Sequence, residues 1–298
     1  MTATVENLAD DHRKGLAIAG IGGILFTFDI PLLRLANPDH LVSQSTLIFG
    51  RGIFLFIAIS LWWYFYRWRR GHRELFLNGW PGIIVACTNT LANILFIAAI
   101  SRTTAANLVF ILALNPIFAA VLAWLVLKEK IPFWTWIAVV LSFTGVGIIV
   151  WDGLITGTWV GDIMALIVAM CTAVALTVIR KTGRNVVTSL ATGSLVSALI
   201  SLWWAQPLLL PMEGWGWLAL NGLIVMPLAS ALIAIGPRYI PSAEVAMFFL
   251  LDTVLTPFWI WMLFGEVPTH RAMVGGALVI STLLAHSVWR YKTHHAHS

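Results

Sequence analysis

Three ionisable side chains of this 298-residue chain lie deep inside apolar segments: Asp29, Arg51 and Asp252. If these segments cross a membrane, each charge costs at least about 2.5–3.5 kcal/mol on insertion scales, so each needs a reason to be there. In that setting ionisable groups pair with one another, carry protons or contact the charged groups of a solute. These three residues are therefore the first candidates for a functional site.

Asp29 and Arg51 are expected at the same depth in neighbouring helices. Asp29 lies seven residues before the end of an apolar segment at 16–36, and Arg51 lies ten residues after the start of the next, at 41–66. At 1.5 Å per residue, both sit roughly 10–15 Å below the same surface. Two interpretations stay open, a structural ion pair or latch and a direct role in substrate binding or coupling.

Asp252 is the twelfth residue of the apolar segment 241–264, and no basic residue of that segment lies within reach. A carboxyl group isolated at mid-membrane should be protonated or paired, because burial disfavours its charged form. If a cavity opens to each side in turn, Asp252 could carry a proton or bind a solute amine. A helix–helix hydrogen bond from a neutral acid is an equally good reading.

Uncharged polar residues at helical spacing surround these positions. Asn89 and Asn93 are four residues apart and so share one face of a helix. A zwitterionic amino acid needs acceptors for its ammonium group and donors for its carboxylate, and amides and broken-helix N-termini supply donors. The alternative for any single Asn is interhelical hydrogen bonding, worth about 0.6 kcal/mol. Further polar candidates are Asn107, Asn115, Thr172, Thr177 and Glu244.

Four prolines predict helix breaks inside apolar segments: Pro31, Pro116, Pro227 and Pro257. A proline within a helix removes one backbone hydrogen bond and kinks the helix. The carbonyl groups freed in this way can line a cavity, although kinked membrane helices without a binding function are also common.

The composition explains what must position these residues. The chain is 59% hydrophobic and 10% charged, whereas soluble proteins carry about 25% charged residues. This excludes a soluble globular enzyme, a disordered segment and a secreted disulfide scaffold. The net charge of +5 comes from basic residues beside apolar runs, so we expect a lipid bilayer as partner and no nucleic acid.

Apolar runs of about 20 residues, enough to cross the hydrocarbon core as helices, occur ten times. Most Lys and Arg residues between them fall on one face, and the other face has only Arg34, Arg102 and Arg271. Because basic loops stay in the cytoplasm, we expect a multi-pass protein of the inner (plasma) membrane with both termini cytoplasmic. The expected spans are 16–36, 41–66, 77–100, 103–127, 131–150, 160–181, 186–206, 214–236, 241–264 and 268–289.

The chain also repeats itself. A shift of 137 positions aligns spans four and five with spans nine and ten, pairing Ala106 with Ala243, Trp124 with Trp261, Glu129 with Glu266 and Asn115 with Asp252. Because each half has five spans, the copies must enter the membrane from opposite sides, as in many secondary transporters. We therefore expect an all-α membrane protein with ten transmembrane helices, arranged as two inverted five-helix repeats at 1–150 and 151–298 within one membrane domain.

Ten spans in a 5+5 arrangement, a length near 300 residues and a Glu closing spans four and nine resemble the drug/metabolite transporter superfamily. More narrowly, the chain is similar to EamA-type exporters, including the YddG-like amino-acid exporters, through the segments Ala105 to Pro132 and Ser242 to Pro268. The resemblance implies export of small metabolites, often amino acids, by alternating access. It also implies a central cavity lined by spans one, three, four, six, eight and nine.

The sequence contains no Gly-rich phosphate loop with a Lys and no His–Glu metal motif. We therefore expect a transporter rather than an enzyme, with no cofactor, no metal and a small-molecule substrate moved by its own gradient or a proton gradient. Amino acids, aromatic or hydrophobic ones included, are the first expectation, because anionic sugar phosphates would require several basic residues near the midplane and only Arg51 is available. Nucleotide-sugar or triose-phosphate transport, an intramembrane enzyme and a structural membrane subunit are the alternatives. The sequence leaves the oligomeric state open, a monomer included.

Overall fold

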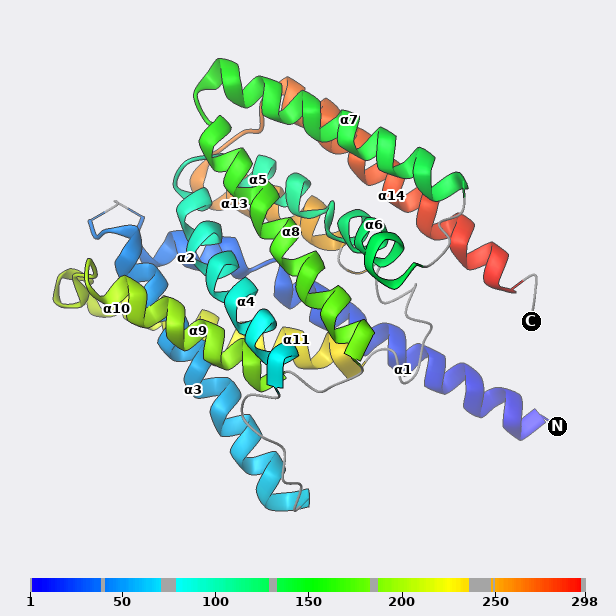
Figure 1. The fold of residues 1–298 in the computed structure, drawn as a ribbon, viewed down its shortest axis with the longest axis horizontal. Coiled ribbons are helices and arrows are strands. Elements are labelled where there is room, and N and C mark those ends of the chain that lie inside the picture. Colours follow the sequence, from blue (N-terminus) through cyan, green and yellow to red (C-terminus); the bar gives the residue numbers. More distant parts are fainter. Residues whose placement is uncertain are drawn as a thin grey trace.

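The helices follow from the apolar sequence, because a segment without access to water must satisfy its backbone hydrogen bonds internally. A computed structural model describes residues 2–38, 41–70, 79–128, 133–182, 187–235, 248 and 250–295. Within these ranges every regular element is a helix (Figure 1). The α-helices are α1 (Thr2–Phe26), α2 (Asp29–Ala36), α3 (Gln44–Arg70), α4 (Gly79–Ile100), α5 (Ala105–Leu112), α6 (Asn115–Leu127), α7 (Phe133–Thr156), α8 (Trp159–Thr182), α9 (Val187–Leu202), α10 (Met212–Ala219), α11 (Met226–Ile235), α13 (Leu250–Phe264) and α14 (His270–His295).

Seven helical stretches of the described chain are long and apolar enough to cross a membrane, which makes this a multi-pass membrane protein. Two shorter apolar helices, Thr188–Leu202 and Leu251–Phe264, fall on the expected seventh and ninth spans, and α14 falls on the tenth. The count of ten therefore stays a prediction. The seven stretches are Arg13–Ala36, Gln44–Phe65, Gly79–Ile100, Ala105–Val126, Phe133–Thr156, Trp159–Ile179 and Met212–Ile233.

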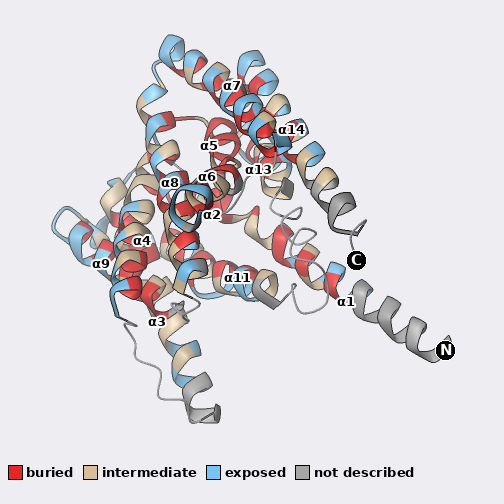
Figure 2. Ribbon diagram, turned by 45° about the vertical axis from the view of Figure 1, so that its right-hand side comes forward, coloured by how far each residue is buried: buried red, intermediate tan, exposed pale blue. Residues whose placement is uncertain are grey.

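Burial separates the centre of the bundle from its lipid-facing rim. Residues Ala105–Ile111 of α5 are all buried, whereas α7 exposes large apolar side chains such as Phe133 and Val140. Figure 2 shows α5 surrounded by other helices and exposed residues along the outside of α7. An apolar rim of this kind suits hydrocarbon, which needs no polar covering.

The first and fourth spans are each built from two helices. α1 ends at Phe26 and α2 begins at Asp29, and α5 ends at Leu112 while α6 begins at Asn115. In both cases the expected proline, Pro31 or Pro116, lies within the first turn after the discontinuity. Proline fits there because the first turn of a helix does not need its N–H groups for internal bonds.

The other two expected breaks have different outcomes. In span eight a π-helical segment, Leu220–Val225, joins α10 to α11, and Pro227 is the second residue of α11. An extra residue per turn accommodates a proline that cannot donate to the preceding turn. The break expected at Pro257 is wrong, because α13 runs continuously from Leu250 to Phe264 with Pro257 inside it.

The packing of the helices is reciprocal between the two halves of the chain. Span three packs against span six (α4 with α8), and the equivalent spans of the other half, eight and one, also pack together (α11 with α1). In the same way span three packs against span seven (α4 with α9), and span eight packs against span two (the π-helical segment and α10 with α3). Three further contacts join equivalent helices of the two halves: α3 with α9, α7 with α14 and α5 with α13. Two repeats related by a two-fold axis produce this pattern. The expected boundary at 150 falls inside α7, which continues to Thr156.

The α7–α14 contact requires glycine. A β-carbon at Gly145 would lie 2.8 Å from the carbonyl oxygen of Gly275, and one at Gly275 would lie 2.6 Å from the carbonyl oxygen of Gly145. Both distances are too short for carbon against oxygen, so the helices approach this closely only because neither residue has a side chain.

We predict that Gly145→Ala lowers the stability of the purified protein by about 1–3 kcal/mol, because it forces α7 and α14 apart. Gly147→Ala on the same helix is the matched control, since a β-carbon at Gly147 meets nothing within 4 Å. The measurement is the thermal unfolding midpoint in detergent. Equal midpoints for the two variants would show that the glycine contact does not hold these helices together.

Candidate functional site

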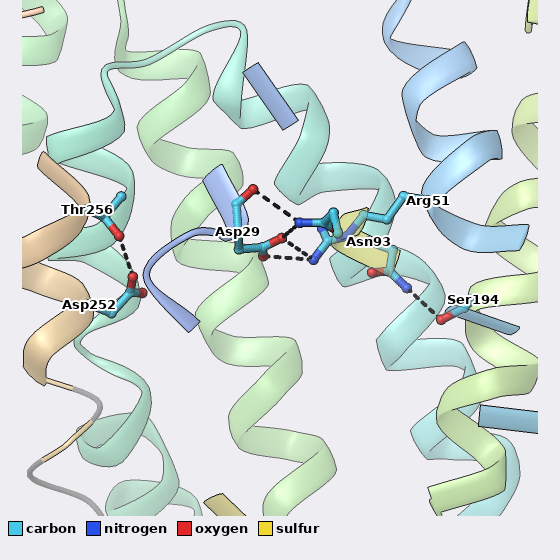
Figure 3. A network of polar contacts seen from close by, with 7 residues as sticks. Asp29, Arg51, Asn93, Ser194, Asp252 and Thr256 are labelled. Atoms are coloured by element: carbon cyan, nitrogen blue, oxygen red, sulfur yellow. Dashed lines mark hydrogen bonds and ion pairs between the residues drawn. The ribbon is translucent and has the colours of Figure 1, made fainter. Parts of the chain in front are cut away.

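Asp29 and Arg51 form a buried ion pair. Nη2 of Arg51 donates to both carboxylate oxygens of Asp29, at 3.0 and 2.8 Å, and the Phe96 ring lies 4.9 Å from the guanidinium carbon. Both residues are less than a tenth exposed. The discontinuity between α1 and α2 allows this ion pair to form, because Asp29 is the first residue of α2 and its side chain points toward Arg51 of α3 (Figure 3).

Asn221 completes this pair and was missed by the sequence analysis. Its side-chain amide donates to Oδ1 of Asp29 at 2.8 Å, and the residue is fully buried in the π-helical segment of span eight. A lone Asn in an apolar run was the available signal. Nε of Arg51 and Oδ1 of Asn221 have no hydrogen-bond partner among the described residues. The first repeat supplies the ion pair, and the second repeat helps to hold it.

Asn89 and Asn93 do share a face, and that face meets α9. The Asn89 amide donates to the Leu190 carbonyl at 2.9 Å and to Oγ of Ser194 at 3.3 Å, while the Asn93 amide donates to Oγ of Ser194 at 3.4 Å. Gly193 makes room for them, because a β-carbon there would lie 2.6 Å from the Ala86 carbonyl oxygen. This geometry favours the interhelical reading of both amides.

Asp252 lies beside the break in span one. Figure 3 shows Asp252 and Asp29 on either side of the segment that joins α1 to α2. Oδ1 of Asp252 lies 2.5 Å from Oγ1 of Thr256, which also lies 3.0 Å from the carbonyl oxygen of Thr27. Nε1 of Trp259 donates to the Thr27 hydroxyl at 3.0 Å. Two hydrogen bonds thus join α13 to the discontinuity in span one. The half-buried carboxyl group of Asp252 lies next to the first of them.

The remaining polar candidates do not join these groups. Thr172 donates to the Val168 carbonyl, one turn earlier in its own helix, at 3.0 Å. Thr177 does the same to Ala173 at 2.8 Å. Oδ1 of Asn115 is buried and has no hydrogen-bond partner among the described residues. Glu244 lies outside the described residues.

A second polar network closes the end of the bundle that carries Arg34, which we call the Arg34 face. Glu266, just after α13, pairs with Nη1 of Arg34 in α2 and accepts the backbone N–H of Ala105, the first residue of α5, at 3.0 Å. Nη2 of Arg34 contacts the Ile100 carbonyl at 3.5 Å. One carboxylate therefore joins three spans, a role that the sequence alone did not reveal for Glu266.

The start of α5 is held from another side as well. Thr103 and Asn107 both donate to Oδ1 of Asp162 in α8, the latter at 3.2 Å, and Asp162 is fully buried. Outside these contacts lies a cavity of about 790 Å³, lined among others by Arg34, Arg102 and Glu266. Within the described ranges no three His, Cys, Asp or Glu residues gather where they could hold a metal ion.

We predict that Arg51→Met costs about 3–5 kcal/mol of stability, because it leaves the Asp29 carboxylate buried without its cation. The double variant Asp29→Asn, Arg51→Met should recover a large part of that loss, since no charge then remains buried. Thermal unfolding of the purified variants measures both. An Arg51→Met variant that unfolds at the wild-type temperature would show that the pair does not stabilise the fold.

Comparison of the sequence with protein families agrees with a molecule built from two repeats. The model of the EamA-like transporter family matches twice, at residues 13–151 and 159–287. No curated protein matches the chain. A solved structure described only as "Crystal structure of protein" is 14% identical, with a TM-score of 0.61, and the match covers 91% of this chain and 96% of that one, which shows a shared fold. Because the two family matches cover nearly the whole sequence, the chain belongs to the EamA-like transporter family of membrane transporters for small metabolites.

Proposed function

We propose that this transporter exports small zwitterionic metabolites, amino acids first, from the cytoplasm by alternating access between its two repeats. The proposal is carried by one observation, the neutralisation of Arg51. Its guanidinium group bonds both oxygens of Asp29, so the one basic residue expected near the midplane already has a carboxylate partner. The described polar groups near the midplane are then amides, hydroxyls and the carboxyl group of Asp252.

This charge balance favours a zwitterion over a sugar phosphate. A phosphate group carries more than one negative charge and calls for cationic or bidentate partners. An amino acid brings one charge of each sign, and Asp252 offers an acceptor for its ammonium group. The Asn89 and Asn93 amides are engaged with α9, which fits an interhelical role for both.

The Arg34 face supports alternating access. Its few basic residues mark it as the outer side, and Glu266 and Asp162 bind the start of α5 to elements of the second repeat there. In the proposed cycle, the state fastened at this end is the one that receives solute from the cytoplasm. Export then requires these contacts to open.

Asp252 is the group we assign to coupling. It lies on span nine, next to the break in span one, so a proton or an amine bound there acts at the boundary between the repeats. Release of that proton or amine from Asp252 alters the hydrogen bonds that hold α13 against the discontinuity in span one. Coupling of this kind needs a carboxyl group that is not already in an ion pair, and within the described chain no ion pair involves Asp252.

We predict that the purified protein in sealed liposomes moves labelled amino acids down their gradients well above the leak of protein-free vesicles. A nucleotide sugar and a triose phosphate, tested in parallel, should stay at the leak level, because the neutralised Arg51 cannot receive their charge. Flux of the nucleotide sugar or the triose phosphate, with no amino-acid flux, would identify a phosphorylated sugar as the substrate instead. Leak-level flux for the entire panel would contradict the proposed function.

We further predict that Asp252→Asn abolishes the pH dependence of amino-acid flux, because an amide cannot take up the proton. Glu213→Gln is the matched control, since it removes one exposed carboxylate at the start of α10, away from the site. Flux is measured with equal pH on both sides of the vesicle across a pH series. A pH profile that survives Asp252→Asn would point to facilitated diffusion without a proton at this residue.

A further inference from the structure

Pro31 leaves one carbonyl group in the middle of span one without its helical partner. In a continuous helix the carbonyl of residue 27 accepts the N–H of residue 31. Residue 31 is proline and has no N–H. The carbonyl oxygen of Thr27 instead faces the hydroxyl of Thr256, 3.0 Å away on α13. Since Thr256 is fully buried, this hydroxyl is the donor that compensates for the proline.

The same hydroxyl also faces Asp252. Oγ1 of Thr256 lies 2.5 Å from Oδ1 of Asp252, one turn earlier on α13. A threonine hydroxyl has one hydrogen to donate and two lone pairs with which to accept. It therefore cannot donate to Asp252 and to Thr27 at the same time. Which of the two receives the hydrogen depends on whether Asp252 is charged.

The two protonation states of Asp252 give two hydrogen-bond patterns. An ionised Asp252 only accepts, and a bond to a carboxylate is stronger than one to a neutral carbonyl, so it takes the hydroxyl hydrogen and leaves Thr27 without a donor. A protonated Asp252 donates to Oγ1 of Thr256, which is then free to donate to Thr27. The bond across the break exists in full only when Asp252 carries a proton.

We propose that Thr256 is a positioning residue that transmits the protonation state of Asp252 to the break in span one. Protonation completes a chain from Asp252 through Thr256 to the Thr27 carbonyl and fastens α13 to the α1–α2 break. Deprotonation breaks the bond from Thr256 to Thr27 and leaves the Thr27 carbonyl without a hydrogen-bond donor at the boundary between the repeats. This inference rests on the proposed role of Asp252 and adds the physical link by which that role moves a helix.

Few other charges face this chain of bonds. α13 packs against α1, α2 and α5. From α2 the charged groups are Asp29, which is held by Arg51 of α3, and Arg34, which is held by Glu266 after the end of α13. The helix α5 and the part of α1 from Gly15 onward contain no titratable residue. The second bond of α13 to the break, from Trp259 to the Thr27 hydroxyl, does not titrate.

The test uses hydrogen–deuterium exchange of the segment 24–32 in the full-length protein, measured across a pH series and corrected for the intrinsic pH dependence of exchange. In the wild type, protection of this segment should fall as Asp252 loses its proton. Thr256→Val and Asp252→Asn should each make the corrected protection independent of pH, whereas Thr256→Ser, which keeps the hydroxyl, should restore the dependence. Thr144→Val is the control, because that exposed hydroxyl bonds only a carbonyl of its own helix.

Transport in liposomes gives the second readout. We expect Thr256→Val to flatten the pH profile of flux and Thr256→Ser to retain it. Pro31→Ala should flatten it too, because alanine returns an N–H to the Thr27 carbonyl. If Asp252→Asn removes the pH dependence but Thr256→Val leaves it intact, the relay is wrong and the coupling role of Asp252 stands. If Asp252→Asn changes neither readout, the coupling role itself fails.

Discussion

In the hydrocarbon core no water is present to hydrogen-bond a backbone carbonyl or N–H group, so the protein must supply the partner wherever a helix is interrupted. The first span of this chain is interrupted at its centre, and the fourth span begins with backbone N–H groups that its own helix cannot satisfy; at each of these two places a group of the other repeat supplies a partner. At the first, Thr256 of α13 reaches the Thr27 carbonyl. At the start of the fourth, Glu266 accepts the N–H of Ala105. The contacts between the repeats are thus dictated by the places where helices cannot satisfy themselves.

Charge follows the same logic. Asp29 and Arg51 are tolerable in the interior because each neutralises the other and Asn221 takes up a further lone pair. A buried pair of this kind contributes little net stability but strongly resists the loss of one member. The pair carries no net charge, and within the described chain Asp252 belongs to no ion pair. A carboxyl group in such surroundings responds to a proton or an amine rather than to a permanent neighbour.

Much of this could be predicted from the sequence, for reasons that concern length and composition. Apolar runs determine where helices lie, and the Asp29–Arg51 contact follows from equal depth in adjacent helices. Pro31 and Pro116 mark interruptions because the chemistry of proline is local. Pro257 does not interrupt α13, since neighbouring helices can support a proline within a span.

The contacts between distant segments could not be predicted in this way. Asn221 reaches Asp29 across 192 positions and Arg34 meets Glu266 across 232. A polar residue in an apolar run signals that a partner exists, but the identity of the partner depends on how the repeats dock. From the sequence, Glu266 reads as the end of a span because it follows the apolar run 241–264 and is followed by Pro268 and Arg271. Its role depends on which helix ends share its face.

Glu266 has a consequence for how the Arg34 face opens. Its single carboxylate serves Arg34 of α2 and the first amide of α5 together. Withdrawing it removes the partner of both groups in one event, whereas Asp162 of α8 holds the start of α5 separately. Loss of Glu266 should therefore release Arg34 at this face while α5 stays attached to α8 through Asp162.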